Sequence, residues 1–374
     1  MQLLAKKAKC PLCGAKNPVD APRCGICTRP LQSQAALPSQ AVYEEALWST
    51  RIASKQARGK VNPYAVLAIA VPITVLVWWA GWTQRTEPTP PPAHPETEFL
   101  KETQFLNTTK QPRLPSSFLV YFSGVGDISD VYQSRYEDEL LDAVKARVPG
   151  LVVITDVFGF SVDNLSMTSQ RRLGWFWSWV NDVRLRKDSP FKRAGVLINL
   201  RNILHVSVSA DSRYGPVYNY SVAEMVLQSL VRHGYVLGSG TPVAQLGFSG
   251  GGQMALASAG TVAATLRAPV QVIGMGGIMN ASPSLGAITR LTLLYGTGDH
   301  VQSLSDWIFP ARWPLLKNSA WNRALREGKI HRLCLGPMGH TKRNSYLDGT
   351  VYLPDGRSYR DVTADAIAEL VTTP

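Results

Sequence analysis

Cysteine is scarce in this chain, with five among 374 residues, and four of these lie before residue 28. A disulfide framework is therefore excluded for the remainder, where Cys334 stands alone and is predicted to be a small core residue. The chain also lacks an internal repeat, which excludes a repeat array. One folded domain is the expectation for the C-terminal part, whose roughly 260 residues suffice for an ample core.

Acidic residues are few near the N-terminus. Residues 1–60 hold ten Lys and Arg against three Asp and Glu, a net charge of +7, so the other 314 residues carry only +5 of the total of +12. Affinity for anionic lipid is the economical explanation of this basic excess. Nucleic-acid binding is disfavoured, because the basic residues are not interleaved with aromatic ones.

A glycine-flanked serine is the most informative motif. Gly247, Ser249 and Gly251 have the G-x-S-x-G spacing of a nucleophile elbow, between an apolar strand and a helix of small residues. Such a turn exposes the serine hydroxyl and places the N–H of Gly250 at a helix start, where it can stabilise an oxyanion. A glycine-rich strand-to-helix turn without chemistry is the alternative, since five-residue patterns recur by chance.

Two further residues follow strand-like segments in an order that suits this serine. Asp299 comes just after the apolar run 290–295, where a carboxylate can orient a histidine. His340 lies in the loop after the run 329–335 and is the candidate general base. Other acids and histidines are weaker candidates, because none follows a strand directly and in this order: Asp306, Asp348, His300, His331, His205 and His233.

From about Leu114 to the C-terminus the chain resembles α/β-hydrolase-fold serine hydrolases, whose triad runs Ser, Asp, His along the sequence. The resemblance implies Ser249 as nucleophile, Asp299 as orienting acid and His340 as base, with oxyanion donors at Gly250 and Val125. The loop before Val125 departs from the family pattern, because Ser123 stands where a histidine is common.

The function implied is hydrolysis of a small-molecule acyl ester, thioester or lipid through an acyl-enzyme, with no cofactor for catalysis. A catalytically idle ligand-binding or sensory module of the same fold is the competing interpretation, because the order of three residues does not establish their geometry.

Strand-like and helix-like segments alternate through this part of the chain. Alternation predicts a doubly wound, mostly parallel sheet with helices on both faces. The segments are strand 118–122, helix 129–147, strand 151–157, helix 218–233, strand 243–248, helix 250–266 and strand 270–275. Gly234 is expected just after the end of the helix 218–233.

Residues 160–210 interrupt this alternation with a helical, basic and aromatic-rich insertion. Three interpretations remain open: a cap over the pocket, a helix that rests on a membrane interface, and a core helix with Trp175 and Trp179 packed inward.

The N-terminus carries paired cysteines with metal-like spacing. Cys10, Cys13, Cys24 and Cys27 form C-x2-C-x10-C-x2-C, and four thiolates suit one tetrahedral, structural Zn²⁺. Residues 8–31 resemble short bacterial zinc ribbons, although Thr28 stands where a glycine is usual. We therefore expect a ribbon over residues 1–31, with a protein partner as a further expectation.

A membrane anchor is predicted between the two domains. Residues 64–82 contain no charge and would span about 28 Å as a helix, enough to cross a bilayer core. A basic polar tether, 32–63, precedes this segment, and a proline-rich stalk, 83–113, follows it. Four basic residues lie just before the span and two within twenty residues after it, which predicts a cytoplasmic N-terminus and an extracytoplasmic hydrolase domain.

Overall fold

The computed structural model describes residues 7–9, 16–18, 115–128, 134–170, 173–185, 192–341 and 343–373. The predicted anchor, tether and stalk lie outside these residues, and so do the four N-terminal cysteines. Within the described part of the chain, no helix is both long and apolar enough to cross a membrane. The same residues hold no group of three or more metal-ligating side chains.

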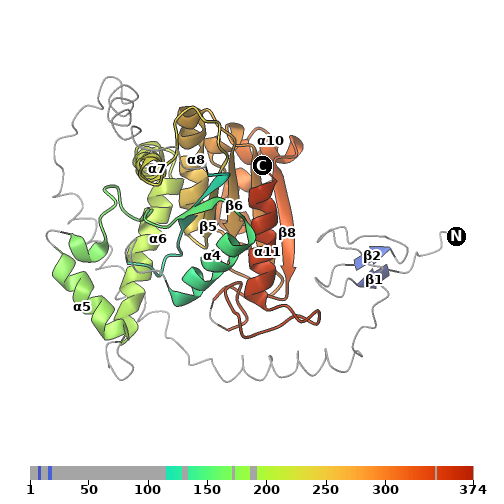
Figure 1. The fold of residues 1–374 in the computed structure, drawn as a ribbon, viewed down its shortest axis with the longest axis horizontal. Coiled ribbons are helices and arrows are strands. Elements are labelled where there is room, and N and C mark those ends of the chain that lie inside the picture. The colour runs from blue at the N-terminus through green and yellow to red at the C-terminus, as the bar shows by residue number, and fades with distance from the viewer. Residues whose placement is uncertain are drawn as a thin grey trace. The chain divides into compact units, whose positions relative to one another are not determined.

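A six-stranded sheet forms the centre of the C-terminal domain (Figure 1). The strands lie in the order β4-β3-β5-β6-β7-β8, and all neighbouring pairs are parallel. Their bounds are β3 Ser117–Phe122, β4 Leu151–Ile154, β5 Val243–Phe248, β6 Val270–Met275, β7 Arg290–Gly296 and β8 Ile330–Gly336. The predicted parallel sheet is confirmed, and the carboxyl ends of all six strands meet at one edge.

Helices cover both faces of this sheet (Figure 1). The described helices are α4 Arg135–Arg147, α5 Gly174–Leu185, α6 Val196–Ala210, α7 Gly215–Arg232, α8 Gly251–Leu266, α9 Leu304–Ile308, α10 Ala320–Arg326 and α11 Tyr359–Thr372. Short 3₁₀ turns join them at Met167–Ser169, Lys192–Gly195, Pro283–Gly286 and Pro310–Arg312. Helices α4 and α11 pack together on one face, and α7 and α8 pack on the other.

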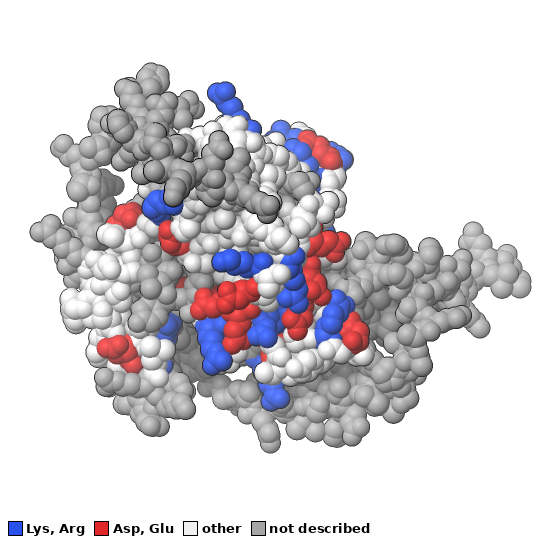
Figure 2. Space-filling model, in the orientation of Figure 1, with Lys and Arg blue, Asp and Glu red and all other residues white. Residues whose placement is uncertain are grey.

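The face under α4 and α11 holds a large apolar cluster. Alternate residues of the central strands, such as Leu246 and Ile273, point to this side and meet Leu140 and Ile367 of the two helices. Outside, the same helices carry interspersed charges (Figure 2), and Arg147 bonds both Asp361 and Asp365. Exposed pairs of this kind contribute little each, so apolar burial holds the layer in place.

The ends of several elements differ from those predicted. Helix α4 begins at Arg135 rather than 129, because Ser134 and Glu137 form a capping box there. Strand β4 ends at Ile154 rather than 157. Helix α7 begins three residues before the predicted 218, and Gly234 follows its end with φ of +89°, as expected of a glycine there.

Of the three interpretations of the insertion, the one in which Trp175 and Trp179 pack inward is wrong. Helix α5 buries Trp177 and Val180 instead, and the side chains of Trp175 and Trp179 are exposed. Trp177 shares its side of the helix with the polar residues Asn181, which is buried, and Arg184, which bonds the Gly126 carbonyl, so apolar spacing favoured the opposite side. Cys334 lies fully buried in β8, as predicted.

Near the N-terminus, β1 Lys7–Lys9 and β2 Lys16–Pro18 form a two-stranded antiparallel sheet. Lys9 pairs with Lys16, so the segment that carries Cys10 and Cys13 joins the two strands.

Candidate active site

The backbone bends sharply at Ser249, between the end of β5 and the start of α8. Ser249 has a φ of +52°, in the left-handed region that side-chain-bearing residues rarely adopt. Its carbonyl accepts hydrogen bonds from Ile278 and Gly252, and its N–H donates to Met275. Three backbone bonds thus hold a strained turn in place, and non-glycine strain of this kind concentrates at functional sites.

Close backbone packing explains the glycines of the motif. A Cβ on Gly247 would lie 2.5 Å from the Gly251 carbonyl oxygen, and one on Gly251 would lie 2.3 Å from the Ser123 carbonyl oxygen. Both contacts are with backbone atoms, which cannot rotate away. The G-x-S-x-G spacing is therefore a steric requirement of this turn.

The structure brings the three predicted triad residues together. His340 Nε2 lies 2.8 Å from Ser249 Oγ, and His340 Nδ1 lies 3.0 Å from Asp299 Oδ2. The ring of Phe248 stacks on the imidazole with centroids 5.3 Å apart. Serine, histidine and carboxylate thus form a continuous hydrogen-bonded chain that can move a proton off the hydroxyl.

Asp299 is kept ionised in spite of its burial. Burial of the carboxyl raises its pKa, but hydrogen bonds from His340 and Tyr346 outweigh this, and the pKa lies below its ordinary value. The backbone N–H groups of Val301 and Gln302 also donate to Oδ1. A carboxylate held by this many donors stays charged and fixes the orientation of the imidazole.

The competing residues lie elsewhere. Asp306 pairs with Arg312 and Arg332, and Asp348 accepts hydrogen bonds from its own loop. Of the other histidines named above, His205 bonds the hydroxyl of Tyr218, and burial lowers its pKa to about 3.

The two predicted oxyanion donors lie side by side at the cavity. Gly250 and Val125 both line the cavity with Ser249, and a Cβ on Gly250 would lie 2.4 Å from Val125 Cγ1. Gly124 packs against Phe248 and the Ser249 side chain. The loop after β3 therefore packs closely against the elbow.

Sequence reasoning missed the residues that fix this loop. Asn202 of α6, fully buried, donates to the carbonyl oxygens of Val125 and Asp127 at 3.0 and 2.7 Å. Arg184 of α5 donates to the Gly126 carbonyl at 2.7 Å. Both come from the 160–210 insertion, whose sequence gives no hint of which distant loop it contacts.

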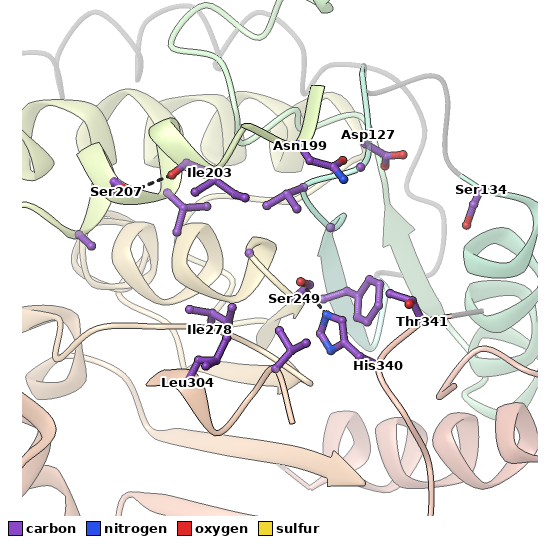
Figure 3. A pocket seen from close by; sticks show the side chains of 18 of the residues that line it. Asp127, Ser134, Asn199, Ile203, Ser207, Ser249, Ile278, Leu304, His340 and Thr341 are labelled. Carbon is purple, nitrogen blue, oxygen red and sulfur yellow. Dashed lines mark hydrogen bonds between the residues drawn. The ribbon is translucent and has the colours of Figure 1, made fainter. Parts of the chain in front are cut away.

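A cavity of about 1050 Å³ opens above Ser249. In Figure 3, Ile203 on α6 lies above Ile278 and Leu304, and Ser249 and His340 lie to the right of these three residues. Much of the α6 wall, including Asn199 and Ser207, belongs to the 160–210 insertion. The volume is at the upper end of the range for small-molecule sites, so a substrate with a long apolar part fits.

Gly276 leaves the room that the triad needs. It follows β6 with φ of +54°, and a Cβ there would lie 2.7 Å from Asp299 Oδ2 and 3.1 Å from His340 Nδ1. In the sequence, only its place directly after a strand hints at this role of Gly276, and that hint is weak.

Tyr346 was also missed, because it has no motif of its own. Its hydroxyl donates to Asp299 Oδ2 at 2.7 Å, the oxygen that faces His340, and accepts from the Gly296 N–H at 2.8 Å. The side chain is fully buried. Tyr346 therefore acts on the imidazole through the carboxylate, as a positioning residue.

We expect Tyr346→Phe to lower kcat about tenfold and to move the acid limb of the pH profile upward. The tyrosine hydroxyl lowers the Asp299 pKa, so its loss lets the carboxyl take up a proton at higher pH. The measurement is the pH dependence of ester hydrolysis, with Tyr352→Phe, an exposed tyrosine, as the control. An unshifted profile would show that Tyr346 is only a packing residue.

The sheet order and the turn at Ser249 define an α/β-hydrolase-like fold. No family model and no curated protein matches the sequence. Among solved structures, the chain is similar to a dienelactone hydrolase from Anabaena variabilis, at 15% identity over 69% of this chain and 85% of that one, with a TM-score of 0.34. It is also similar to a carboxylesterase from Mesorhizobium loti, at 13% identity over 69% and 90%, with a TM-score of 0.34.

Proposed function

We propose that this protein is a serine hydrolase that cleaves an acyl ester through an acyl-enzyme. The observation that carries the proposal is the continuous chain from Ser249 Oγ through His340 to Asp299, with contacts of 2.8 and 3.0 Å. The strained elbow and the adjacent Gly250 and Val125 add to its support.

In the first half of the reaction Ser249 Oγ attacks the acyl carbonyl carbon, and its proton passes to His340 Nε2. Asp299 stabilises the imidazolium, and the N–H groups of Gly250 and Val125 bind the oxyanion. His340 then returns the proton to the leaving alcohol as the ester C–O bond breaks. Water repeats these steps on the acyl-enzyme and releases the acid.

A fluorophosphonate probe tests this proposal, because it forms an adduct only with an activated serine. We expect stoichiometric labelling of the full chain and none of Ser249→Ala. Ser303→Ala is the control, since the Ser303 hydroxyl donates to the His300 carbonyl and does not touch the triad. Absence of labelling in the unmodified protein would favour the idle binding module.

We also propose that the four N-terminal cysteines bind one structural Zn²⁺. The pairing of β1 with β2 supports this, because it brings the two ends of the segment with Cys10 and Cys13 together. Zinc would supply folding energy there and no catalytic chemistry. The ribbon would then be available to a protein partner.

One zinc per chain is the expected result of elemental analysis on the purified full-length protein. Cys13→Ser should lose the metal and leave ester hydrolysis within about twofold, because the ribbon carries none of the triad. Cys334→Ala, which changes the buried cysteine of β8, should keep the metal. Zinc retained in a variant that lacks all four N-terminal cysteines would refute the ribbon.

The third proposal is that residues 64–82 anchor the chain with its N-terminus in the cytoplasm. Protease added to intact spheroplasts should then digest the hydrolase domain and spare the ribbon, because the excess of basic residues before residue 64 keeps the N-terminal flank of the span in the cytoplasm. Neutralising Arg51, Lys55, Arg58 and Lys60 while adding lysines after Trp82 should invert a measurable fraction. A reporter at Pro374 that reads as cytoplasmic in the unmodified chain would contradict this orientation.

A further inference from the structure

The mouth of the cavity is bordered by apolar side chains that are also open to solvent. Leu185 of α5, Ile203 of α6, and Leu304 and Ile308 of α9 line the cavity, yet are 64%, 47%, 45% and 56% exposed. We call these four residues the apolar rim. Single exposed apolar residues are ordinary, but four from three separate helices around one opening mark an interaction surface.

The exposed apolar surface extends beyond the rim on α9. Trp307 is 81% exposed and does not line the cavity. It lies three residues after Leu304 and one before Ile308, so the three side chains share one side of the short helix. An indole with an apolar body and a polar N–H suits the interface between lipid and water.

Among the described side chains, those over α5 and α6 are mostly uncharged in Figure 2, whereas charges of both signs are interspersed over α4 and α11. The sequence around α5 is nevertheless basic, with seven Lys and Arg and two Asp between residues 171 and 193. Apolar side chains with basic residues close by in sequence fit a surface that is apolar beneath an anionic layer.

The position of the domain in the chain also favours a lipid surface as the partner of the rim. Residues 83–114 separate the predicted anchor from the first described residue of the domain. The proposed anchor would therefore tether the domain to a bilayer, so a lipid surface is a partner that the domain meets at high local concentration.

We propose that the apolar rim and Trp307 rest on a lipid bilayer, and that the substrate is a lipid ester drawn from that bilayer into the cavity. This deepens the proposed function and rests on it. Contact of the rim with lipid gives an acyl chain a path to Ser249 that avoids water, which removes the cost of exposing the chain. The reaction is that given above, with a fatty acid and the remaining lipid alcohol as products.

The test uses the full chain reconstituted in vesicles of phosphatidylcholine and phosphatidylglycerol. It compares hydrolysis of a fluorogenic lipid ester in the bilayer with that of a soluble short-chain ester. We expect Trp307→Ser to slow hydrolysis of the lipid ester about tenfold and to leave hydrolysis of the soluble ester within twofold of the unmodified rate. Tyr352→Ser, which removes another exposed aromatic away from the cavity, should change neither.

A second readout does not depend on activity. Brominated lipid should quench the tryptophan emission of the unmodified chain more than that of Trp307→Phe. The quenching in Tyr352→Ser should equal that in the unmodified chain. Unchanged lipid hydrolysis in Trp307→Ser, or no Trp307-dependent quenching, would overturn the lipid contact while the proposed function stood. If Ser249→Ala leaves both hydrolyses intact, the proposed function fails, and quenching alone decides whether the rim meets lipid. A chain that is dimeric when unmodified and monomeric as Trp307→Ser, with no quenching by brominated lipid, would assign the rim to a second copy instead.

Discussion

Ser249→Ala and His340→Ala should each lower kcat on a short acyl ester by about 10⁴-fold or more. The two side chains act as one unit, because the hydroxyl is a weak nucleophile until the imidazole 2.8 Å away takes its proton. The double variant should therefore be hardly less active than either single one. Steady-state kinetics on purified full-length protein measures all three.

The matched control for this loss is His331→Ala, which removes an exposed histidine near the start of β8, at the other end of that strand from the loop that carries His340. Its kcat should stay within about twofold. Full activity in Ser249→Ala would sink the mechanism, and additive losses in the double variant would mean that the two residues act in separate steps.

Gly251→Ala should destabilise the fold by more than about 2 kcal/mol. Helix propensity predicts the opposite sign, since alanine in a helix is favoured over glycine by about 1 kcal/mol. The steric term wins because the new methyl group would lie 2.3 and 2.4 Å from the carbonyl oxygens of Ser123 and Phe122. Urea unfolding followed by circular dichroism gives the difference.

Gly286→Ala is the matched control for this glycine. A Cβ at Gly286 meets nothing within 4 Å, and its φ is not positive, so the free energy of unfolding should change by less than about 0.5 kcal/mol. A Gly251→Ala variant as stable as the unmodified protein would show that the turn at Ser249 is looser than the close backbone contacts indicate.

The elbow was predictable because its chemistry is local. Gly247, Ser249 and Gly251 lie within five residues. The backbone that excludes a side chain at each glycine belongs to the turn itself or to the end of the neighbouring strand β3. Asp299 and His340 could be placed because each directly follows a strand of a parallel sheet, and such ends meet at one edge.

The support around the triad was not predictable, because each contact joins residues far apart in sequence. Tyr346 lies 47 residues from Asp299, and Asn202 lies 77 residues from Val125. Neither residue type is unusual in its local segment. Helix α5 shows a further limit, since Trp177 shares its side of the helix with Asn181 and Arg184, and apolar spacing therefore favours Trp175 instead.

The most direct test of the central claim is to stop the reaction of a short acyl ester within milliseconds by acid and to measure the mass of the intact protein and of its peptides. A chain in which Ser249 is the nucleophile should carry one added acyl group, on the peptide that contains Ser249, and the group should disappear in Ser249→Ala. An acyl group on another residue, or rapid hydrolysis with no acylated protein at any time, would contradict the account.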